Sequence, residues 1–278
     1  IGAGHRPLLP RVWRVVLELG DGDVRLLLDA DNGGRVVSLT VGDLRLLRTP
    51  DDDPGGTHWG SFVMAPWAGR TRHGRFTFDG VEHQLEVNSG DHSIHGTVRS
   101  RPWTVDDASP RRARLSCEFG PRWPFAGWAE QVITVHADHA ELELSMHAAD
   151  GPMPAVGGWH PWWQRRLSTG EPATLELPAG SMYLRDGEGI AVPDKTPPPP
   201  GPWDDCFSDL TGPPTLRWAG ALELAVESDC PCVVVYDEPE EAICVEPQSG
   251  PPDALNHGPA VAEPGRPVVI HSLWRWCT

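Results

Sequence analysis

Residues 128–148 read WAEQVITVHADHAELELSMHA, and this stretch decides the fold. Apolar and polar residues alternate from Trp128 to Ala137 and again from Glu141 to Ala148, which is the period-two pattern of β-strands. Asp138 and His139 between them form a two-residue turn signal. The two strands are therefore expected to pair as an antiparallel hairpin.

The same alternation recurs along most of the chain. Ten further segments read as strands: Val12 to Leu19, Val24 to Asp29, Arg35 to Val41, Arg75 to Phe78, Val81 to Val87, Arg112 to Phe119, Ala221 to Glu227, Cys232 to Asp237, Ala242 to Glu246 and Val268 to Trp276. No segment has the period of an amphipathic helix, and turn signals such as Asp79-Gly80 and Ala219-Gly220 separate several strands. The sequence therefore predicts an all-β fold, a large antiparallel β-sandwich that forms one domain over residues 1–278.

Two segments interrupt the strand pattern, and we interpret both as loops within that domain. Thr49 to Gly56 (TPDDDPGG) is acidic and rich in glycine and proline. Pro193 to Pro202 contains the run Pro197 to Pro200 and is expected to stay out of any sheet, as an extended surface segment.

Composition excludes several classes of partner. The 278 residues contain 39 Asp and Glu against 23 Lys and Arg, a formal net charge of −16, which disfavours binding to nucleic acid. No run of about 18 apolar residues is present, so a transmembrane helix is excluded. The first ten residues lack the apolar core of a signal peptide, and the six cysteines show no compact disulfide framework. A cytoplasmic protein is expected.

Thirteen tryptophans are unusual beside two tyrosines and six phenylalanines. Seven of them are in Gly/Pro-rich connections: Trp59, Trp67, Trp103, Trp159, Trp162, Trp163 and Trp203. Aromatic rings in such connections often line a cleft, and an aromatic cleft with carboxylates is typical of a sugar site. These rings are therefore candidates for the wall of a carbohydrate cleft.

Three ionisable residues each precede a residue that stops a strand: His95 before Gly96, His160 before Pro161 and Glu246 before Pro247. Groups at strand ends are exposed and can converge on one cleft. The three could form a metal triad or an acid–base set. The local spacing typical of a metal site is absent, and a glutamate with a histidine suits proton transfer at neutral pH, so we favour acid–base catalysis without a metal.

At these residues the chain resembles the aldose 1-epimerases, or mutarotases, most closely their bacterial branch. The resemblance covers nearly the whole chain and rests on five motifs in the family's order: a P-x-x-x-R loop ending at Arg70, an H-G-x₆-W run from His95 to Trp103, an H-P-aromatic-aromatic run from His160 to Trp163, a D-x-x-F element from Asp204 to Phe207, and E-P-Q-S/T-G-P-P-D-A starting at Glu246. It implies a galactose mutarotase-like supersandwich that interconverts the α and β anomers of a hexose by opening and reclosing the sugar ring.

The resemblance also implies a role for each site residue. Glu246 matches the general base that removes the proton from the anomeric hydroxyl, and His160 matches the general acid that protonates the ring oxygen. His95 matches the second histidine near that oxygen. Arg70 and Asp204 match positions that bind sugar hydroxyls, with Asp205 as an alternative to Asp204. The implied reaction needs only a small-molecule sugar, a base and an acid on opposite sides of the C–O bond, and no cofactor.

Two departures from the family pattern leave the sugar open. Gly69 stands where the family usually has asparagine, and Trp162 and Trp163 replace a tyrosine–phenylalanine pair. One alternative is an epimerase for hexose 6-phosphates, because several arginines flank the expected cleft: Arg72, Arg75, Arg99, Arg101, Arg165 and Arg166. The other is a carbohydrate-binding sandwich without catalysis. The oligomeric state also stays open.

Overall fold

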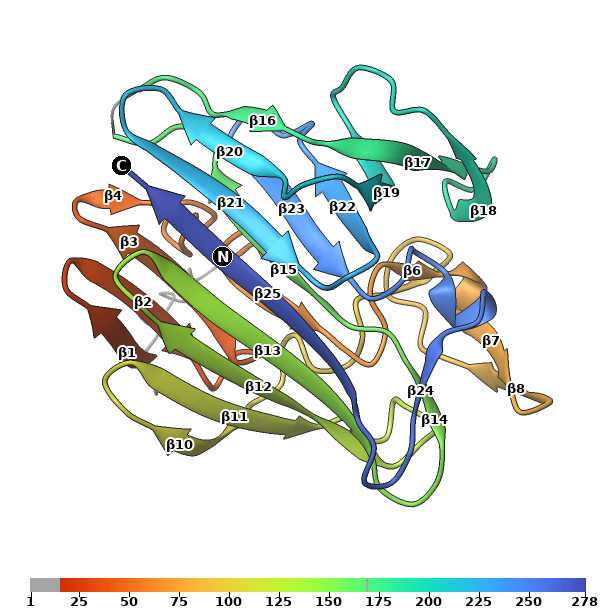
Figure 1. Cartoon of the computed structure of the whole chain (residues 1–278). Helices are drawn as coiled ribbons and strands as arrows, with labels where there is room; N and C mark the ends of the chain where they lie inside the picture. The colour runs from red at the N-terminus through yellow and green to blue at the C-terminus, as the bar shows by residue number, and fades with distance from the viewer. Residues whose placement is uncertain (1–15, 169) are drawn as a thin grey trace, which may run out of the picture.

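Two large antiparallel sheets dominate the fold (Figure 1), which a computed structural model describes over residues 16–168 and 170–278. The eleven-stranded sheet has the spatial order β1 (Val16–Asp21), β2 (Val24–Asp29), β3 (Arg35–Val41), β5 (Ser61–Met64), β15 (Gly158–Gln164), β23 (Ala242–Gln248), β22 (Cys232–Tyr236), β19 (Asp204–Leu210), β17 (Ala179–Arg185) and β18 (Ala191–Thr196), with β4 (Leu44–Arg45) beside β3. The eight-stranded sheet has the order β10 (Thr104–Ala108), β11 (Arg112–Glu118), β12 (Gly127–Val135), β13 (His139–Ala148), β25 (Val268–Cys277), β21 (Leu222–Ser228), β20 (Thr215–Trp218) and β16 (Thr174–Glu176).

Three short ribbons and two helical turns complete the described structure. The ribbons pair β6 (Arg70–Thr71) with β9 (Ser93–Ile94), β7 (Arg75–Phe78) with β8 (Val81–Gln84), and β14 (Met153–Ala155) with β24 (Ala260–Ala262). The helical turns are η1 (Arg72–Gly74) and η2 (Ala254–Asn256), and both are 3₁₀ turns. Neither turn is long enough to cross a membrane, and no other helix is present in residues 16–168 and 170–278.

The hairpin predicted from residues 128–148 is confirmed as β12 and β13, which pair antiparallel with Trp128 opposite His147. Buried and part-exposed residues alternate along β12, because its inner face packs in the core. One large apolar cluster contains buried side chains from both sheets, among them Leu39 of β3 and Leu144 of β13. The predicted antiparallel sandwich is therefore confirmed. The first four residues of the strand expected from Val12 lie outside the described residues.

The two predicted loops differ in outcome. Residues 49–56 form a loop, in which the Asp52 carboxylate accepts a hydrogen bond from the Thr49 amide at 2.7 Å and pairs with Arg45 at 2.9 Å. The proline-rich segment was expected to stay out of the sheet, but β18 includes Pro193. Because β18 is an edge strand, the missing N–H of a proline can be tolerated on its open side.

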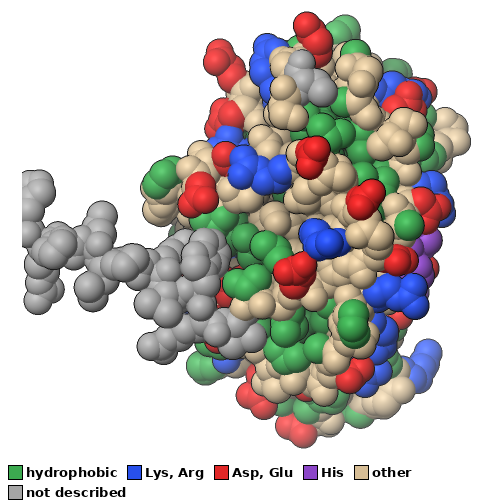
Figure 2. Space-filling view, turned by 90° about the vertical axis from the view of Figure 1, so that its left-hand side faces the viewer, with side chains coloured by type: hydrophobic (Ala, Val, Ile, Leu, Met, Phe, Trp, Pro, Cys, Tyr) green, Lys and Arg blue, Asp and Glu red, His purple; other side chains and the backbone are tan. Residues whose placement is uncertain are grey.

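Acidic and basic side chains are interspersed on the face drawn in Figure 2, with no broad basic area. This distribution agrees with the excess of acidic residues in the sequence. It gives this face no resemblance to the continuous basic surface on which nucleic-acid binding depends.

Candidate active site

The strands β15 and β23 bring His160 and Glu246 together in the middle of the eleven-stranded sheet. Gly158 pairs with Gln248 and Trp162 with Cys244, so the same register places His160 directly opposite Glu246. Side chains alternate in direction along each strand: Trp163 and Val245 belong to the main core, whereas His160 and Glu246 point to the opposite face of the sheet. Directly opposite residues on one face are close enough for their side chains to touch.

Both residues lie inside their strands, not at the strand ends that the sequence predicted. Pro161 pairs with Ser61 of β5, and Pro247 pairs with Val233 of β22. The pairing of β15 with β23 is interrupted between Gly158 and Trp162, where both prolines lie. A proline cannot donate a ladder hydrogen bond, so the prolines interrupt the ladder here without ending either strand.

A cavity of about 350 Å³ opens over this point of the sheet. All five residues predicted for the site line it: Arg70, His95, His160, Asp204 and Glu246. They come from five separate elements or loops, and each is supplied by one of the sequence motifs. The size suits a monosaccharide, because small-molecule sites start at roughly 300 Å³.

The His160 imidazole and the Glu246 carboxylate are in contact. Nε2 of His160 lies 3.2 Å from Oε1 of Glu246, and the two residues are 7% and 2% exposed. The other carboxylate oxygen accepts a hydrogen bond from Nε2 of Gln248 at 3.2 Å. Gln248 is two residues further along β23 and therefore on the same face.

Burial pushes both members of the pair toward their neutral forms. Burial, and then the negative charge of Asp204, raises the pKa of Glu246 well above its usual value. Burial, and then the positive charges of Arg35 and Arg99, lowers the pKa of His160 to about 3. At any pH between the pKa of His160 and that of Glu246, the pair holds one proton. pKa shifts of this kind are frequent where proton transfer takes place.

His95 approaches the pair from a connecting segment. Its ring centroid lies 5.2 Å from that of His160, nearly perpendicular to it, and burial lowers the pKa of His95 well below its usual value. The backbone at His95 has a φ of 62°, and at Gly96 a φ of 70°. A Cβ at Gly96 would lie 2.0 Å from the Ala65 carbonyl oxygen, so only glycine fits there. Gly96 thus allows the close backbone approach that positions His95.

Asp204 and Arg70 also line the cavity, and their charges act in opposite directions on the pKa of Glu246. Arg70 also lowers the pKa of His95 and pairs with Ile94, so it lies near both His95 and Glu246. Burial raises the pKa of Asp204, whereas the cations Arg70 and Arg185 lower it. Arg185 binds Asp205 at 2.9 Å and approaches Asp204 only to 3.7 Å. Asp205 is therefore held more tightly by protein than Asp204, which leaves Asp204 the better acceptor for a ligand hydroxyl.

The tryptophan prediction is largely wrong. Of the seven rings assigned to connections, only Trp162 lines the cavity, where it stacks on His160 at 5.0 Å and on His58 at 4.5 Å. Trp159 and Trp163 are on β15 and face the main core. Large rings are efficient fillers of a sandwich core, and this role explains most of them.

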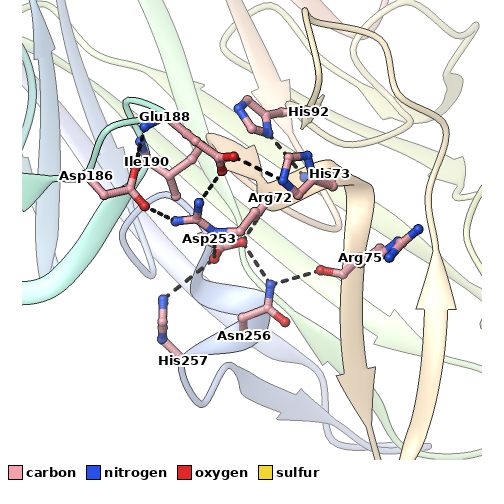
Figure 3. Close-up of polar contacts among 10 residues, drawn as sticks. All are labelled: Arg72, His73, Arg75, His92, Asp186, Glu188, Ile190, Asp253, Asn256 and His257. Atoms are coloured by element: carbon pink, nitrogen blue, oxygen red, sulfur yellow. Dashed lines mark hydrogen bonds and ion pairs between the residues drawn. The ribbon is translucent and has the colours of Figure 1, made fainter.

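The arginine prediction is also mostly wrong, because only Arg99 of the six lines the cavity. Figure 3 shows that Arg72 is engaged by carboxylates: it pairs with Asp186 and Glu188 of the β17–β18 turn, while its backbone amide donates to Asp253 at 2.8 Å. The others bind protein groups away from the cavity: Arg75 binds Gln84, Arg101 the Glu118 carbonyl, Arg165 the Asp237 carbonyl and Arg166 the Gly170 carbonyl.

Donor atoms of a kind that Zn²⁺ accepts occur at the acid–base pair. His160, Cys244 and Glu246 each offer one ligand atom, and the three atoms lie within 4.8 Å of one another. A second group, His136, His139 and Glu141, is at the β12–β13 turn. An ion on the first group would occupy the atoms that proton transfer requires.

Sequence reasoning did not identify several residues of the cavity wall. Gln248 could have been found, because it follows Glu246 at the strand period within the same motif. His58 and Phe62 carried no signal, since neither is in a recognisable motif. Phe62 contacts the rings of His160 and His95, at centroid distances of 4.7 and 5.6 Å.

Comparisons with known proteins agree with this fold. The sequence profile of the family described as aldose 1-epimerase matches residues 16–190. The chain is 26% identical to YihR of Escherichia coli K12 over 221 residues, which are 70% of this chain and 71% of YihR.

Solved structures of this fold superpose over nearly the whole chain. A galactose mutarotase-like protein from Clostridium acetobutylicum has a TM-score of 0.83 at 15% identity and covers 95% of each chain. A galactose 1-epimerase from Lactobacillus acidophilus has a TM-score of 0.78 at 16% identity and covers 94% of each. The match of the profile to more than half of the sequence shows that the chain belongs to the aldose 1-epimerase family.

Proposed function

We propose that this protein interconverts the α and β anomers of a hexose, with Glu246 as general base and His160 as general acid. The observation that carries the proposal is the 3.2 Å contact between two buried, oppositely acting groups on the wall of a cavity of monosaccharide size. A positioned acid or base contributes about 10²- to 10⁴-fold to a reaction that consists of proton transfers.

The chemistry requires only proton movements and one bond rotation. Glu246 removes the proton from the anomeric hydroxyl while His160 gives a proton to the ring oxygen, and the bond between C1 and that oxygen breaks. Rotation about the C1–C2 bond turns the other face of the aldehyde toward the ring hydroxyl. Reclosure reverses both transfers and returns each proton to its starting side, so no net proton is consumed.

Acid and base act side by side in this arrangement, not on opposite sides of the bond as the sequence argument had them. The two sugar oxygens that exchange protons are bonded to the same carbon, so adjacent groups can reach both. The neutral pair and the carboxylate–imidazolium pair hold the same number of protons and differ by one transfer across the 3.2 Å contact. The proposed roles use the carboxylate–imidazolium form, which one proton transfer from Glu246 to His160 generates from the neutral pair.

Three other residues complete the proposed site. His95 borders the ring-oxygen side, where its perpendicular ring holds the His160 imidazole in place. Asp204 binds sugar hydroxyls near Glu246, and Arg70 binds them between Glu246 and His95. Gln248 donates to the Glu246 carboxylate and so favours its charged form.

Polarimetry of freshly dissolved α-D-glucose and α-D-galactose tests this proposal. Glu246→Gln and His160→Gln are each expected to lower kcat at least about 100-fold, while binding of a methyl glycoside, which cannot open, is retained. Glu143→Gln and His271→Gln are matched controls, because this exposed Glu–His pair, 3.5 Å apart, is on the eight-stranded sheet. Near wild-type turnover in the first two variants would refute the assignment, and a wild-type protein that binds the glycoside without accelerating mutarotation would be a carbohydrate-binding sandwich.

A further inference from the structure

Two cations on the cavity wall, Arg70 and Arg99, form no side-chain hydrogen bond or ion pair with the described residues, but the charge of Arg70 acts on the carboxylates Asp204 and Glu246. Arg99 lines the cavity, and no hydrogen bond or ion pair joins its side chain to any residue of the described ranges. Burial lowers its pKa, and no carboxylate is close enough to oppose this effect. Desolvating a guanidinium without a counter-charge is costly, so its position calls for an explanation.

The absence of a carboxylate near Arg99 among the described residues is unusual in a chain with an excess of acidic residues. The chain contains 39 carboxylate side chains for 23 Lys and Arg, so a cation without one nearby is unusual here. Arg185, which also lines the cavity, binds Asp205 at 2.9 Å. Arg72, just outside the cavity, is held by Asp186 and Glu188. Arg70 has carboxylates nearby, since its charge lowers the pKa of Asp204, whereas Arg99 has none within the described ranges and is left for a ligand.

Its position relative to the acid–base pair is defined by Phe62. The Phe62 ring lies 4.7 Å from the ring of His160, 5.6 Å from that of His95 and 6.0 Å from Cζ of Arg99. The charge of Arg99 lowers the pKa of both histidines, after the larger effect of burial, but is not among the influences on Glu246. Arg99 is therefore on the histidine side of the cavity.

The sugar's geometry then assigns the group that meets this cation. In the proposed reaction the anomeric hydroxyl faces Glu246 and the ring oxygen faces His160. The ring oxygen joins C1 to C5, and C5 carries the exocyclic carbon 6, so the path from Glu246 past His160 continues toward carbon 6. Building on the proposed function, we infer that Arg99 binds an oxyanion on carbon 6 of the sugar, and that the substrate is an anionic hexose.

Six arginines in the sequence suggested a hexose 6-phosphate as substrate, and only one of them, Arg99, lines the cavity. The inference rests on Arg99 alone, since the other five arginines are engaged elsewhere. A guanidinium forms paired, charge-assisted hydrogen bonds with either a carboxylate or a phosphate. The shared chemistry is a carbon-6 oxyanion, and two substrates separate its sources: glucuronate carries the carboxylate and glucose 6-phosphate the phosphate.

The experiment compares kcat/KM for anomerisation of glucose, glucuronate and glucose 6-phosphate in wild type, Arg99→Met and Arg75→Met. Arg75 is the control, because it is exposed, binds Gln84 and is outside the cavity. We expect the wild type to prefer at least one anionic sugar over glucose. Arg99→Met should reduce that preference about 10- to 100-fold, as expected for the loss of hydrogen bonds between charged groups, whereas Arg75→Met should preserve it. The anion with the larger reduction identifies the group that Arg99 binds.

A binding measurement separates failure of this inference from failure of the proposed function. Methyl β-D-glucuronide and methyl β-D-glucoside cannot open, so calorimetry on them reports recognition without catalysis. Tighter binding of the glucuronide that disappears in Arg99→Met would support a carboxylate site even in a protein that anomerises nothing. The inference is overturned by equal selectivity of wild type and Arg99→Met for both anions, whatever the turnover of glucose.

Discussion

Replacing Arg72 with methionine should weaken sugar binding without slowing the chemical step. Arg72 is on η1, beside the cavity residue Arg70, and its guanidinium pairs with Asp186 and Glu188 across the gap to the β17–β18 turn (Figure 3). Gly189 of this turn and Ala191, the first residue of β18, line the cavity. The ion pairs therefore hold one wall of the cavity against the loop that carries Arg70.

The magnitude follows from the exposure of these groups. The side chains of Arg72, Asp186 and Glu188 are between 31% and 45% exposed, so solvent screens each pair and each contributes about 0.2–1 kcal/mol. Two such pairs contribute about 0.4–2 kcal/mol, and because about 1.4 kcal/mol is a factor of ten, closure of this wall weakens about 2- to 30-fold. KM should rise by up to that factor, while kcat changes less than about twofold because the acid–base pair is untouched.

The assay is initial-rate polarimetry over a range of sugar concentrations, which gives kcat and KM separately. Arg217→Met is the matched control, because Arg217 also bridges two carboxylates, Glu176 and Glu223, on the eight-stranded sheet. Its KM should equal that of the wild type. A fall in kcat with unchanged KM in Arg72→Met would contradict the reasoning, since it would place Arg72 in the chemical step.

Three further predictions concern the pair and its surroundings. Burial lowers the pKa of His160 to about 3 and raises that of Glu246 well above its usual value, so the one-proton pair persists between these two pKa values. The kcat/KM profile should therefore fall on its alkaline side where Glu246 loses its proton, and Gln248→Leu, which removes a hydrogen bond to the carboxylate, should move that fall to higher pH; an unchanged profile in this variant would contradict the assignment. Gly96→Ala should lower the free energy of unfolding in urea by more than about 3 kcal/mol, because the new Cβ would lie 2.0 Å from the Ala65 carbonyl oxygen. The control Gly22→Ala has a similar positive φ but open space around it, and should lower the free energy of unfolding by only about 1–2 kcal/mol. Equal losses in the two variants would exclude the steric cause. Zn²⁺ should compete with the sugar by binding His160, Cys244 and Glu246. Cys244→Ser should relieve this inhibition, whereas the control Cys277→Ser, at an exposed cysteine, should not. Inhibition that Cys244→Ser leaves unchanged would place the ion elsewhere.

Alternation in the sequence was a reliable guide where one face of a strand is exposed. β12 and β13 alternate between buried and more exposed residues, and their sequence shows it. β5 and β15 are buried almost throughout, because the core covers one face and the cavity and its loops cover the other. With no polar face, β15 had no period to read, and Pro161 made Gly158–Gln164 look like a loop.

The candidate site was predictable in its motifs but not in its assembly. The five motif residues all line the cavity, yet the contact between His160 and Glu246, residues 86 positions apart in the sequence, depends on the register between β15 and β23. His58 and Phe62 come from the segments around β5, where no periodicity or motif marks a side chain that faces the cavity. Arg99 was expected at the cleft, but the sequence did not separate it from the five other arginines that lie elsewhere. Their contribution follows from three-dimensional packing alone.

The net charge of −16 and an anionic substrate are compatible, because they act over different distances. At physiological ionic strength exposed charges are screened beyond about 8 Å, so the many surface carboxylates contribute little inside the cavity. A small anion that enters the cavity meets Arg99 in a partly desolvated setting, where attraction is stronger than in water. A long polyanion, by contrast, must lie along the surface and face those carboxylates directly. The same composition that argues against nucleic acid therefore leaves room for a sugar with a single negatively charged substituent.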